Sequence, residues 1–331
     1  MGSHTRRRLL STTLGGLVWG TVAFTGACAQ AQNLPGWFLS PPPDTAEAWF
    51  AVGEGPDPEA ARRTALRAVA ARLRSAIEGS VTSDVTDANG RVTRRDSVKV
   101  SEDVLRTEFT KVDVLNTARS SQGVMVQLRV DRPAFIRDTV AQLEVAARPV
   151  DEAEAAVQGQ STLEQYLALR RVLPDIDKAI NLNLLLVGAG QEAAGRQGFA
   201  RYTALKQRTE GLSTRMVFEV RTRPEDGDIA QVVAGALADR GMRSATRATP
   251  GANVLSVDTT TREVTLGSDK LVRLVVRFSV ADDQGRAVAS REHQLSGASR
   301  FDHKGAREAA VAALASTLKR NPSLAPFGFK E

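Results

Sequence analysis

The sequence has little of the chemistry from which most active sites and metal sites are built. Cys28 is the only cysteine in 331 residues, which excludes an internal disulfide and a cysteine-based metal site. The three histidines, His4, His293 and His303, do not have the spacing of a zinc motif. We therefore expect neither a metal ion nor a cofactor.

Aromatic residues and a strong charge imbalance are also missing. Aromatic residues make up 5% of the chain, whereas hydrophobic residues as a whole make up a normal 42%. This composition favours alanine-rich helices packed on sheets over a deep aromatic pocket. Arg6, Arg7 and Arg8 contribute three of the six net positive charges, so the rest of the chain is nearly balanced. Nucleic acid is therefore not expected as a partner.

The sequence contains no nucleophile elbow and no phosphate-binding loop. Residues 188–193 (GAGQEA) fit a dinucleotide fingerprint, but the residues before them keep a helical period. We interpret this segment as a glycine-rich break between two helices. Asp282 and Asp283 before Gly285 predict a hairpin turn and not a calcium loop. We expect no enzymatic activity; the alternative is a carboxylate pair that only the fold brings together.

Residues 1–31 have the three-part plan of a secretory signal. A basic start with Arg6 and Arg7 precedes an apolar stretch over 9–24 and a small, polar stretch over 25–31. The apolar stretch is shorter than the roughly 20 residues that span a bilayer. Arg6 and Arg7 also fit a twin-arginine signal, so both export routes remain open. We expect export to the periplasm or to a periplasm-facing membrane.

Two kinds of cleavage fit the end of this segment. Residues 25–28 (TGAC) resemble a lipobox, in which Cys28 becomes the lipidated N-terminus, although Thr25 stands where leucine is usual. Alternatively, ordinary signal peptidase cuts within the small residues 27–31. The sequence leaves both outcomes open: a lipoprotein on a membrane such as the outer membrane, and a soluble periplasmic protein.

The predicted elements form two sheet-containing domains on either side of a helical connector. We assign 32–148 to the first domain, 149–211 to the connector, 212–321 to the second domain and 322–331 to an extended tail. Both domains are expected to be α+β, with helices on one face of a small antiparallel sheet. The predicted strands are 48–52, 109–115, 124–130, 216–220, 254–258, 271–280 and 287–295, with a further hairpin around Asn89-Gly90. The predicted helices are 58–77, 132–146, 152–171, 176–187, 192–207, 228–240 and a last one that Asp302 caps.

The start of the first domain is rich in proline and tryptophan. Prolines break helices, so we expect segment 35–44 not to be helical. Trp37, Phe38 and Trp49 have two interpretations: cover for the core or the sheet edge, or a contact surface for another protein.

Three stretches near the start of the first domain form a distinctive layout. They are PGWFLSPP at 35–42, AVGEG at 51–55 and EAARRTA at 59–65. This layout resembles the bacterial lipoprotein-twenty family and is similar to the N-terminal domain of the flagellar H-ring assembly protein, over about residues 35–146. The resemblance implies an envelope location, a small α+β domain and a role in surface structures or envelope organisation. It supplies no catalytic residues.

Together these expectations describe a non-enzymatic, exported envelope protein. We expect it to bind or scaffold other envelope proteins, with flagellar or surface-organelle assembly as one setting. The alternative is a periplasmic regulator that docks on an envelope enzyme or transporter through its last domain. The identity of the partner and the oligomeric state, a homo-oligomer included, remain open.

Overall fold

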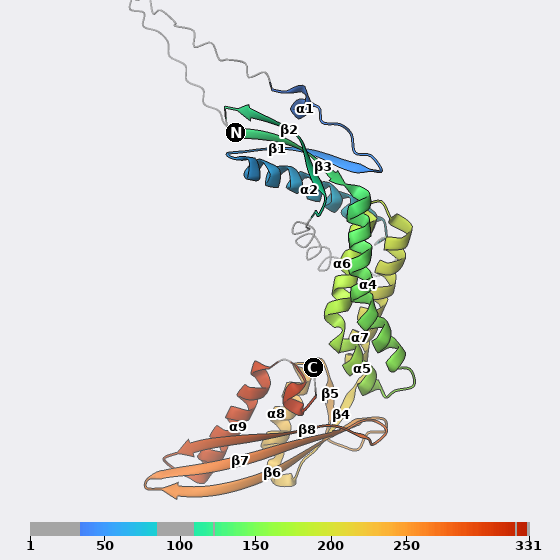
Figure 1. The fold of residues 1–331 in the computed structure, drawn as a ribbon. Coiled ribbons are helices and arrows are strands. Elements are labelled where there is room, and N and C mark those ends of the chain that lie inside the picture. The colour runs from blue at the N-terminus through green and yellow to red at the C-terminus, as the bar shows by residue number, and fades with distance from the viewer. Residues whose placement is uncertain (1–33, 85–108, 122, 322, 330–331) are drawn as a thin grey trace, which may run out of the picture.

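The computed structural model describes residues 34–84, 109–121, 123–321 and 323–329. Within these residues, Figure 1 shows two sheets at opposite ends of an elongated molecule, joined by a column of helices. The N-terminal sheet has the strand order β1-β3-β2 and the C-terminal sheet the order β5-β4-β6-β7-β8. Because helices pack on both sheets, the described chain has the expected α+β fold.

The N-terminal unit packs one long helix against three antiparallel strands. Its elements are β1 (Ala48–Gly55), α2 (Pro58–Asp84), β2 (Val112–Ser120) and β3 (Gly123–Asp131). The predicted helical period turns Val69, Leu73 and Ile77 toward the core, where each is at most 4% exposed. In β1, Gly53 lies so close to α2 that a Cβ atom would collide with the backbone of that helix. Glycine is therefore required for this close approach.

Four helices follow and form the column between the two sheets. They are α4 (Arg132–Ala156), α5 (Thr162–Arg171), α6 (Leu173–Gly188) and α7 (Glu192–Arg215). The prediction that the first of them ends near residue 146 was wrong, because α4 continues through Pro149. Pro149 removes only the hydrogen bond to the carbonyl of Val145, which lies on the exposed side of the helix with a 66% exposed side chain. The helix predicted over 152–171 is in fact two helices, separated at 157–161.

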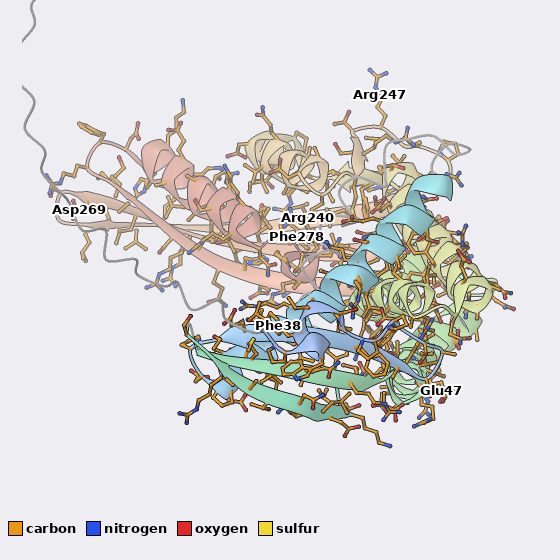
Figure 2. All side chains as sticks on the ribbon, turned by 90° about the horizontal axis from the view of Figure 1, so that it is seen from above. Phe38, Glu47, Arg240, Arg247, Asp269 and Phe278 are labelled. Atoms are coloured by element: carbon orange, nitrogen blue, oxygen red, sulfur yellow. The ribbon has the colours of Figure 1, made fainter. Side chains whose placement is uncertain are left out.

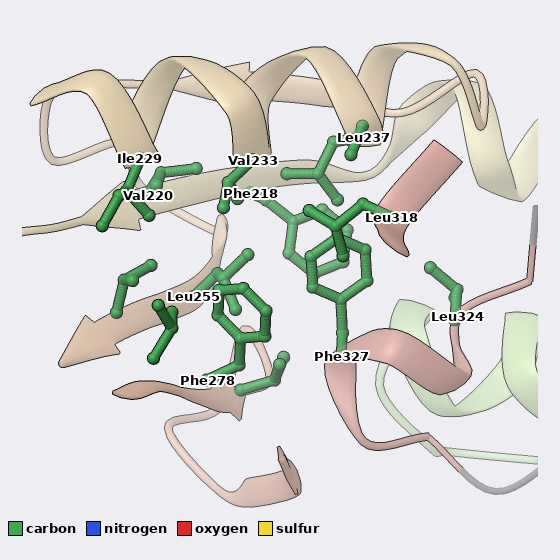
Figure 3. Close-up of a cluster of buried hydrophobic side chains, with 14 of the residues drawn as sticks. Phe218, Val220, Ile229, Val233, Leu237, Leu255, Phe278, Leu318, Leu324 and Phe327 are labelled. Atoms are coloured by element: carbon green, nitrogen blue, oxygen red, sulfur yellow. The ribbon is translucent and has the colours of Figure 1, made fainter. Parts of the chain in front are cut away.

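The C-terminal unit covers one face of a five-stranded sheet with two helices. Figure 3 shows its core, in which Phe218, Phe278 and Phe327 meet between α8, α9 and the strands. Each of these three rings is at most 1% exposed. The elements are β4 (Val217–Arg221), η1 (Pro224–Asp226), α8 (Gly227–Ala238), β5 (Arg243–Ala245), β6 (Asn253–Leu266), β7 (Asp269–Ala281), β8 (Ala287–Ser299) and α9 (His303–Arg320).

This sheet differs from the predicted antiparallel one in two respects. The short strand β5 was not predicted, and β4 pairs in parallel with both β5 and β6. In addition, β6 and β7 form one long hairpin that turns at Gly267, whereas the prediction ended the first strand at 258. Residues 259–266 are mostly polar and exposed, so they lack the apolar alternation that indicates a strand.

Two segments near the chain ends also differ from expectation. The proline-rich segment contains a short helix, α1 (Gly36–Leu39), because Pro35 precedes its first turn and the next proline, Pro41, comes only after its end. The tail is not extended: η2 (Ala325–Phe327) packs Phe327 into the C-terminal core. Apolar side chains in the tail gain more from burial than an extended chain would allow.

One cluster of buried residues draws on both the first predicted domain and the predicted connector. It contains Val130 of β3, Val150 of α4, Ile176 of α6 and Tyr202 of α7. The predicted boundary after residue 148 falls inside α4, while the division into 32–148, 149–211 and 212–321 remains a prediction about independent folding. The hairpin predicted at Asn89-Gly90 lies outside the described residues.

Candidate functional site

The residues singled out in the sequence lie in three different settings. Cys28, Arg6 and Arg7 fall outside the described residues. Trp37 and Phe38 are half-buried on α1, with their rings edge to face at 6.0 Å between centroids. Figure 2 shows Phe38 beside the N-terminal sheet. These two rings thus lie at the border between the sheet and solvent.

Trp49 belongs to the core and does not contribute to a contact surface. It is 6% exposed, and its ring centroid lies 5.4 Å from that of Phe135 and 6.5 Å from that of Phe109. The guanidinium of Arg132 lies over the indole at 5.5 Å from the ring centroid. The interpretation of Trp49 as a protein contact is therefore wrong, because a buried strand position leaves the side chain no access to a partner.

Arg132 ties the N-terminal sheet to the turn between α6 and α7. Its Nε and Nη2 donate to the carbonyl of Ala189 at 3.0 and 2.8 Å, and its Nη1 donates to the carbonyl of Thr45 at 2.9 Å. Ala189 lies in segment 188–193, which is the glycine-rich break between helices that the sequence predicted. Gly190, at φ 85°, faces the Arg132 side chain. The segment thus serves as a docking point for an arginine of the chain itself.

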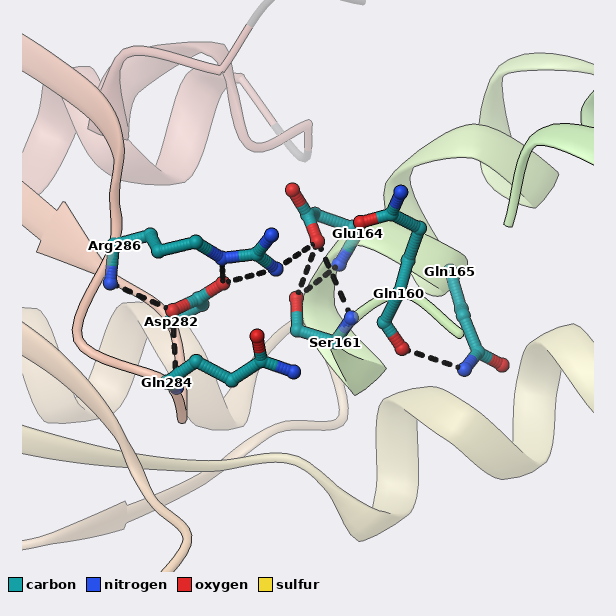
Figure 4. A network of polar contacts seen from close by, with 7 residues as sticks. All are labelled: Gln160, Ser161, Glu164, Gln165, Asp282, Gln284 and Arg286. Carbon is teal, nitrogen blue, oxygen red and sulfur yellow. Dashed lines mark hydrogen bonds and ion pairs between the residues drawn. The ribbon is translucent and has the colours of Figure 1, made fainter. Parts of the chain in front are cut away.

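A second polar network joins α5 to the turn after β7, and Figure 4 shows its members. Asp282 accepts hydrogen bonds from the backbone N–H groups of Gln284 and Arg286 at 3.0 and 2.8 Å, and from Arg286 Nε at 2.9 Å. Arg286 also forms an ion pair with Glu164 of α5. Glu164 in turn completes a capping box with Ser161 at the start of that helix. The network therefore fixes the C-terminal sheet to the helical column.

The protonation of Asp282 is coupled to this network. Burial raises the pKa of its carboxyl, but the hydrogen bonds from Arg286 and Gln284 outweigh burial and hold the pKa below its usual range. The predicted hairpin turn is confirmed, and the Asp282 carboxylate is occupied by donors from that turn. The Asp282 carboxylate is therefore charged, and its role is to hold the turn together.

Two carboxylates share one arginine at the start of α8. Asp226, with a 1% exposed side chain, accepts from Thr259 Oγ1 at 2.6 Å and from Arg307 Nη2 at 2.8 Å. Arg307 also pairs with Asp228 at 3.2 Å, and the hydrogen bonds to Asp228 and Asp226 raise the pKa of Arg307 against the effect of burial. One arginine thus holds two carboxylates, and these contacts join the start of α8 to β6 and α9.

Both histidines of the C-terminal unit take part in packing. His293 Nε2 donates to the carbonyl of Pro326 at 2.7 Å, and its ring lies 5.4 Å from that of Phe278. His303 is the first residue of α9, and its Nε2 lies 3.3 Å from Thr265 Oγ1. Each histidine thus joins two elements of the same unit.

Two kinds of feature are absent from the part of the chain that the structure describes. There, no group of three or more His, Cys, Asp or Glu side chains is placed to hold a metal ion. In the same residues, no helix is both long enough and apolar enough to cross a membrane.

Comparison with known proteins gives a partial likeness in fold. No family model matches the chain, and no curated protein matches it. Among solved structures, a minor lipoprotein from Acinetobacter baumannii is 20% identical and covers 33% of this chain and 89% of its own, with a TM-score of 0.27. A secreted protein from Helicobacter pylori is 7% identical and covers 86% of this chain and 99% of its own, with a TM-score of 0.36. At these scores, the function of this chain has to be argued from its own residues.

Proposed function

We propose that this chain is an exported envelope protein that binds or scaffolds other envelope proteins and catalyses no reaction itself. Its setting is the periplasm or a periplasm-facing membrane, reached through the leader at residues 1–31. The resemblance to the lipoprotein-twenty family favours a role in a surface organelle such as the flagellum. The role in a surface organelle is the more specific part of the proposal, and the envelope location is the more general part.

The observation that carries the proposal is the open face of the C-terminal sheet. Helices α8 and α9 pack on the other face, where alternate residues of β7 such as Val276 and Phe278 are fully buried. On the open face, exposed Thr260 of β6 and Gln294 of β8 flank Val275 in one cross-strand row. Figure 1 shows this side of β6, β7 and β8 without a covering helix. A broad sheet surface of this kind suits contact with another protein.

A second observation supports the absence of catalysis. The buried acidic residues of the described chain are Glu219, Asp226 and Asp282, and each pairs with an arginine within 2.9 Å. Each buried carboxylate thus has a structural partner within the fold.

The alternative proposal is a regulator that docks on an envelope enzyme or transporter through the same open face. Both proposals use the same surface and differ in the partner. The distinguishing observation is the partner's activity, which changes on contact only in the second case.

In-cell photo-crosslinking tests the proposal. A photoreactive amino acid at Gln294 on the open face should give one discrete adduct with another envelope protein. The matched control is Glu308, which is exposed on α9 and should give none. Equal adduct patterns at both positions, or no protein adduct at Gln294, would contradict the proposal.

A further inference from the structure

The far end of the C-terminal sheet exposes large apolar side chains. Leu266, at the turn between β6 and β7, is 69% exposed, and Phe301, between β8 and α9, is 92% exposed. The register places both at the same end, because Leu266 pairs with Asp269 and Lys270 pairs with Ser299. Figure 2 shows Asp269 at the end of the long strands that lies away from the helical column. We call residues 262–273 and 298–304 the hairpin tip.

On the open face of the sheet, the side chains of the hairpin tip form rows that run across the strands, with apolar residues near the end and arginines behind them. Leu266 and Asp269 form the end row, and the next row joins Val264, Leu271 and Ala298. The row behind it joins Arg262 and Arg273, both exposed. Arg262 lies four positions before Leu266 in β6, which places the arginines about 13 Å behind the end row.

The arginine row is electrostatically unbalanced. Arg262 and Arg273 stand directly opposite each other, and like charges in this position destabilise a sheet. Within the residues that the structure describes, neither guanidinium forms an ion pair or a side-chain hydrogen bond, and only the backbone groups of the two arginines take part in the sheet. An anion from outside the chain would relieve this repulsion. The cations of the hairpin tip are Arg262, Lys270, Arg273, Arg300 and Lys304, and its acids are Glu263, Asp269 and Asp302.

We propose that the hairpin tip docks on an anionic lipid surface. Leu266 and Phe301 enter the boundary between headgroups and acyl chains, while Arg262 and Arg273 lie at the level of the lipid phosphates. An interfacial segment enters a bilayer by about 5–10 Å, which fits an apolar end backed by cations at about 13 Å. Arginine suits this position because its planar guanidinium binds phosphate oxygens in pairs.

The lipid proposal extends the proposed envelope location, but its test does not depend on that location. Residues 32–331 contain every helix and strand that the structure describes. This purified chain should co-sediment with vesicles of phosphatidylglycerol and phosphatidylcholine in equal parts, and not with phosphatidylcholine alone. Added salt should weaken the binding, because it screens the arginines.

Two double variants separate the apolar and the charged contributions. Leu266→Ser with Phe301→Ser, and Arg262→Gln with Arg273→Gln, should each weaken binding to the anionic vesicles about tenfold or more. Leu39→Ser with Val145→Ser makes the same apolar change at two residues outside the hairpin tip that are 67% and 66% exposed. This control should bind like the unchanged chain. All six positions are exposed, so no thermal unfolding midpoint should fall, and the arginine variant should unfold at the same temperature or slightly higher because its charge repulsion is removed.

A fluorescent reporter locates the contact. Tryptophan at position 301 (Phe301→Trp) should shift its emission to shorter wavelength when anionic vesicles are added, whereas Leu39→Trp should not. Equal binding to both vesicle types, no binding to either, or equal losses in the tip variants and the control would overturn the proposal. No lipid affinity at all would leave the hairpin tip as a contact for a protein.

Discussion

At the scale of single residues, both units use the same device to bring a helix onto a sheet. A strand glycine faces two alanines spaced four apart on the helix: Gly53 faces Ala61 and Ala65, and Gly297 faces Ala306 and Ala310. All four alanines are fully buried. Removing the side chain on the strand lets the backbone of the helix lie directly on the sheet.

Replacing Gly297 with alanine tests this device in the C-terminal unit. The added Cβ would collide with the backbone of Ala306 and Ala310, so α9 has to move. We expect Gly297→Ala to lower the free energy of unfolding by about 1–3 kcal/mol. Urea titration followed by circular dichroism measures this change.

Gly235→Ala provides the matched control in the same unit. Gly235 lies inside α8 with open space where its Cβ would be. The substitution should stabilise the protein by up to about 1 kcal/mol, because alanine favours helix. Equal effects of the two substitutions would show that the close packing at Gly297 is unimportant.

The structural roles of some residues could be predicted from the sequence, and those of others could not. The Asp302 cap and the turn at Gly285 follow local rules, and the structure has both. Arg132 and Arg307 were not predicted as anchors, because their partners lie 57 and 81 residues away in the chain. An arginine alone gives no local sign of such a partner.

At the scale of elements, helices and apolar strands followed from their periodicity, whereas the long polar hairpin did not. The outer half of β6 is mostly polar and exposed, so burial does not impose an apolar alternation there, whereas β7 keeps its alternation with Val272 and Leu274 buried. The exposed ends are also where the apolar and arginine rows of the hairpin tip come together. That juxtaposition depends on the strand register, which the sequence did not specify.

The network around Asp282 makes a prediction about acid stability. Hydrogen bonds lower the pKa of Asp282, so its contribution to stability is fully present above the unfolded value of about 3.9. The contribution is lost as the pH falls through the lower pKa of the folded state. Asp282→Asn should therefore lower the unfolding midpoint at neutral pH, and the difference from the unchanged chain should shrink in acid.

Thermal unfolding between neutral pH and pH about 3 measures this difference. Asp283→Asn is the matched control, since it changes the exposed carboxylate next in the chain and should leave the neutral midpoint unchanged. A constant difference between Asp282→Asn and the unchanged chain at every pH would show that the charge of Asp282 is not what stabilises the turn.

At the scale of the whole molecule, the two sheets have separate cores linked by ion-paired helices. The C-terminal core includes Leu163 and Tyr166 of α5, and the Arg286–Glu164 pair joins the same helix to the sheet. Helix α5 is therefore part of the C-terminal packing, although the sequence placed it in a connector. The pattern of helices predicted the connector, but which core each helix would join depended on long-range packing.

Export is the step on which the envelope setting and the proposed envelope partner both depend. Fractionation of the native cells, followed by the intact mass of the protein, tests it most directly. If the protein is exported, we expect a cleaved chain in the periplasm or the envelope that begins at Cys28 or within the next few residues. Labelling with a radioactive fatty acid, lost in Cys28→Ala, would identify the lipidated form. An uncleaved, full-length chain in the cytoplasm would show that the protein is not exported.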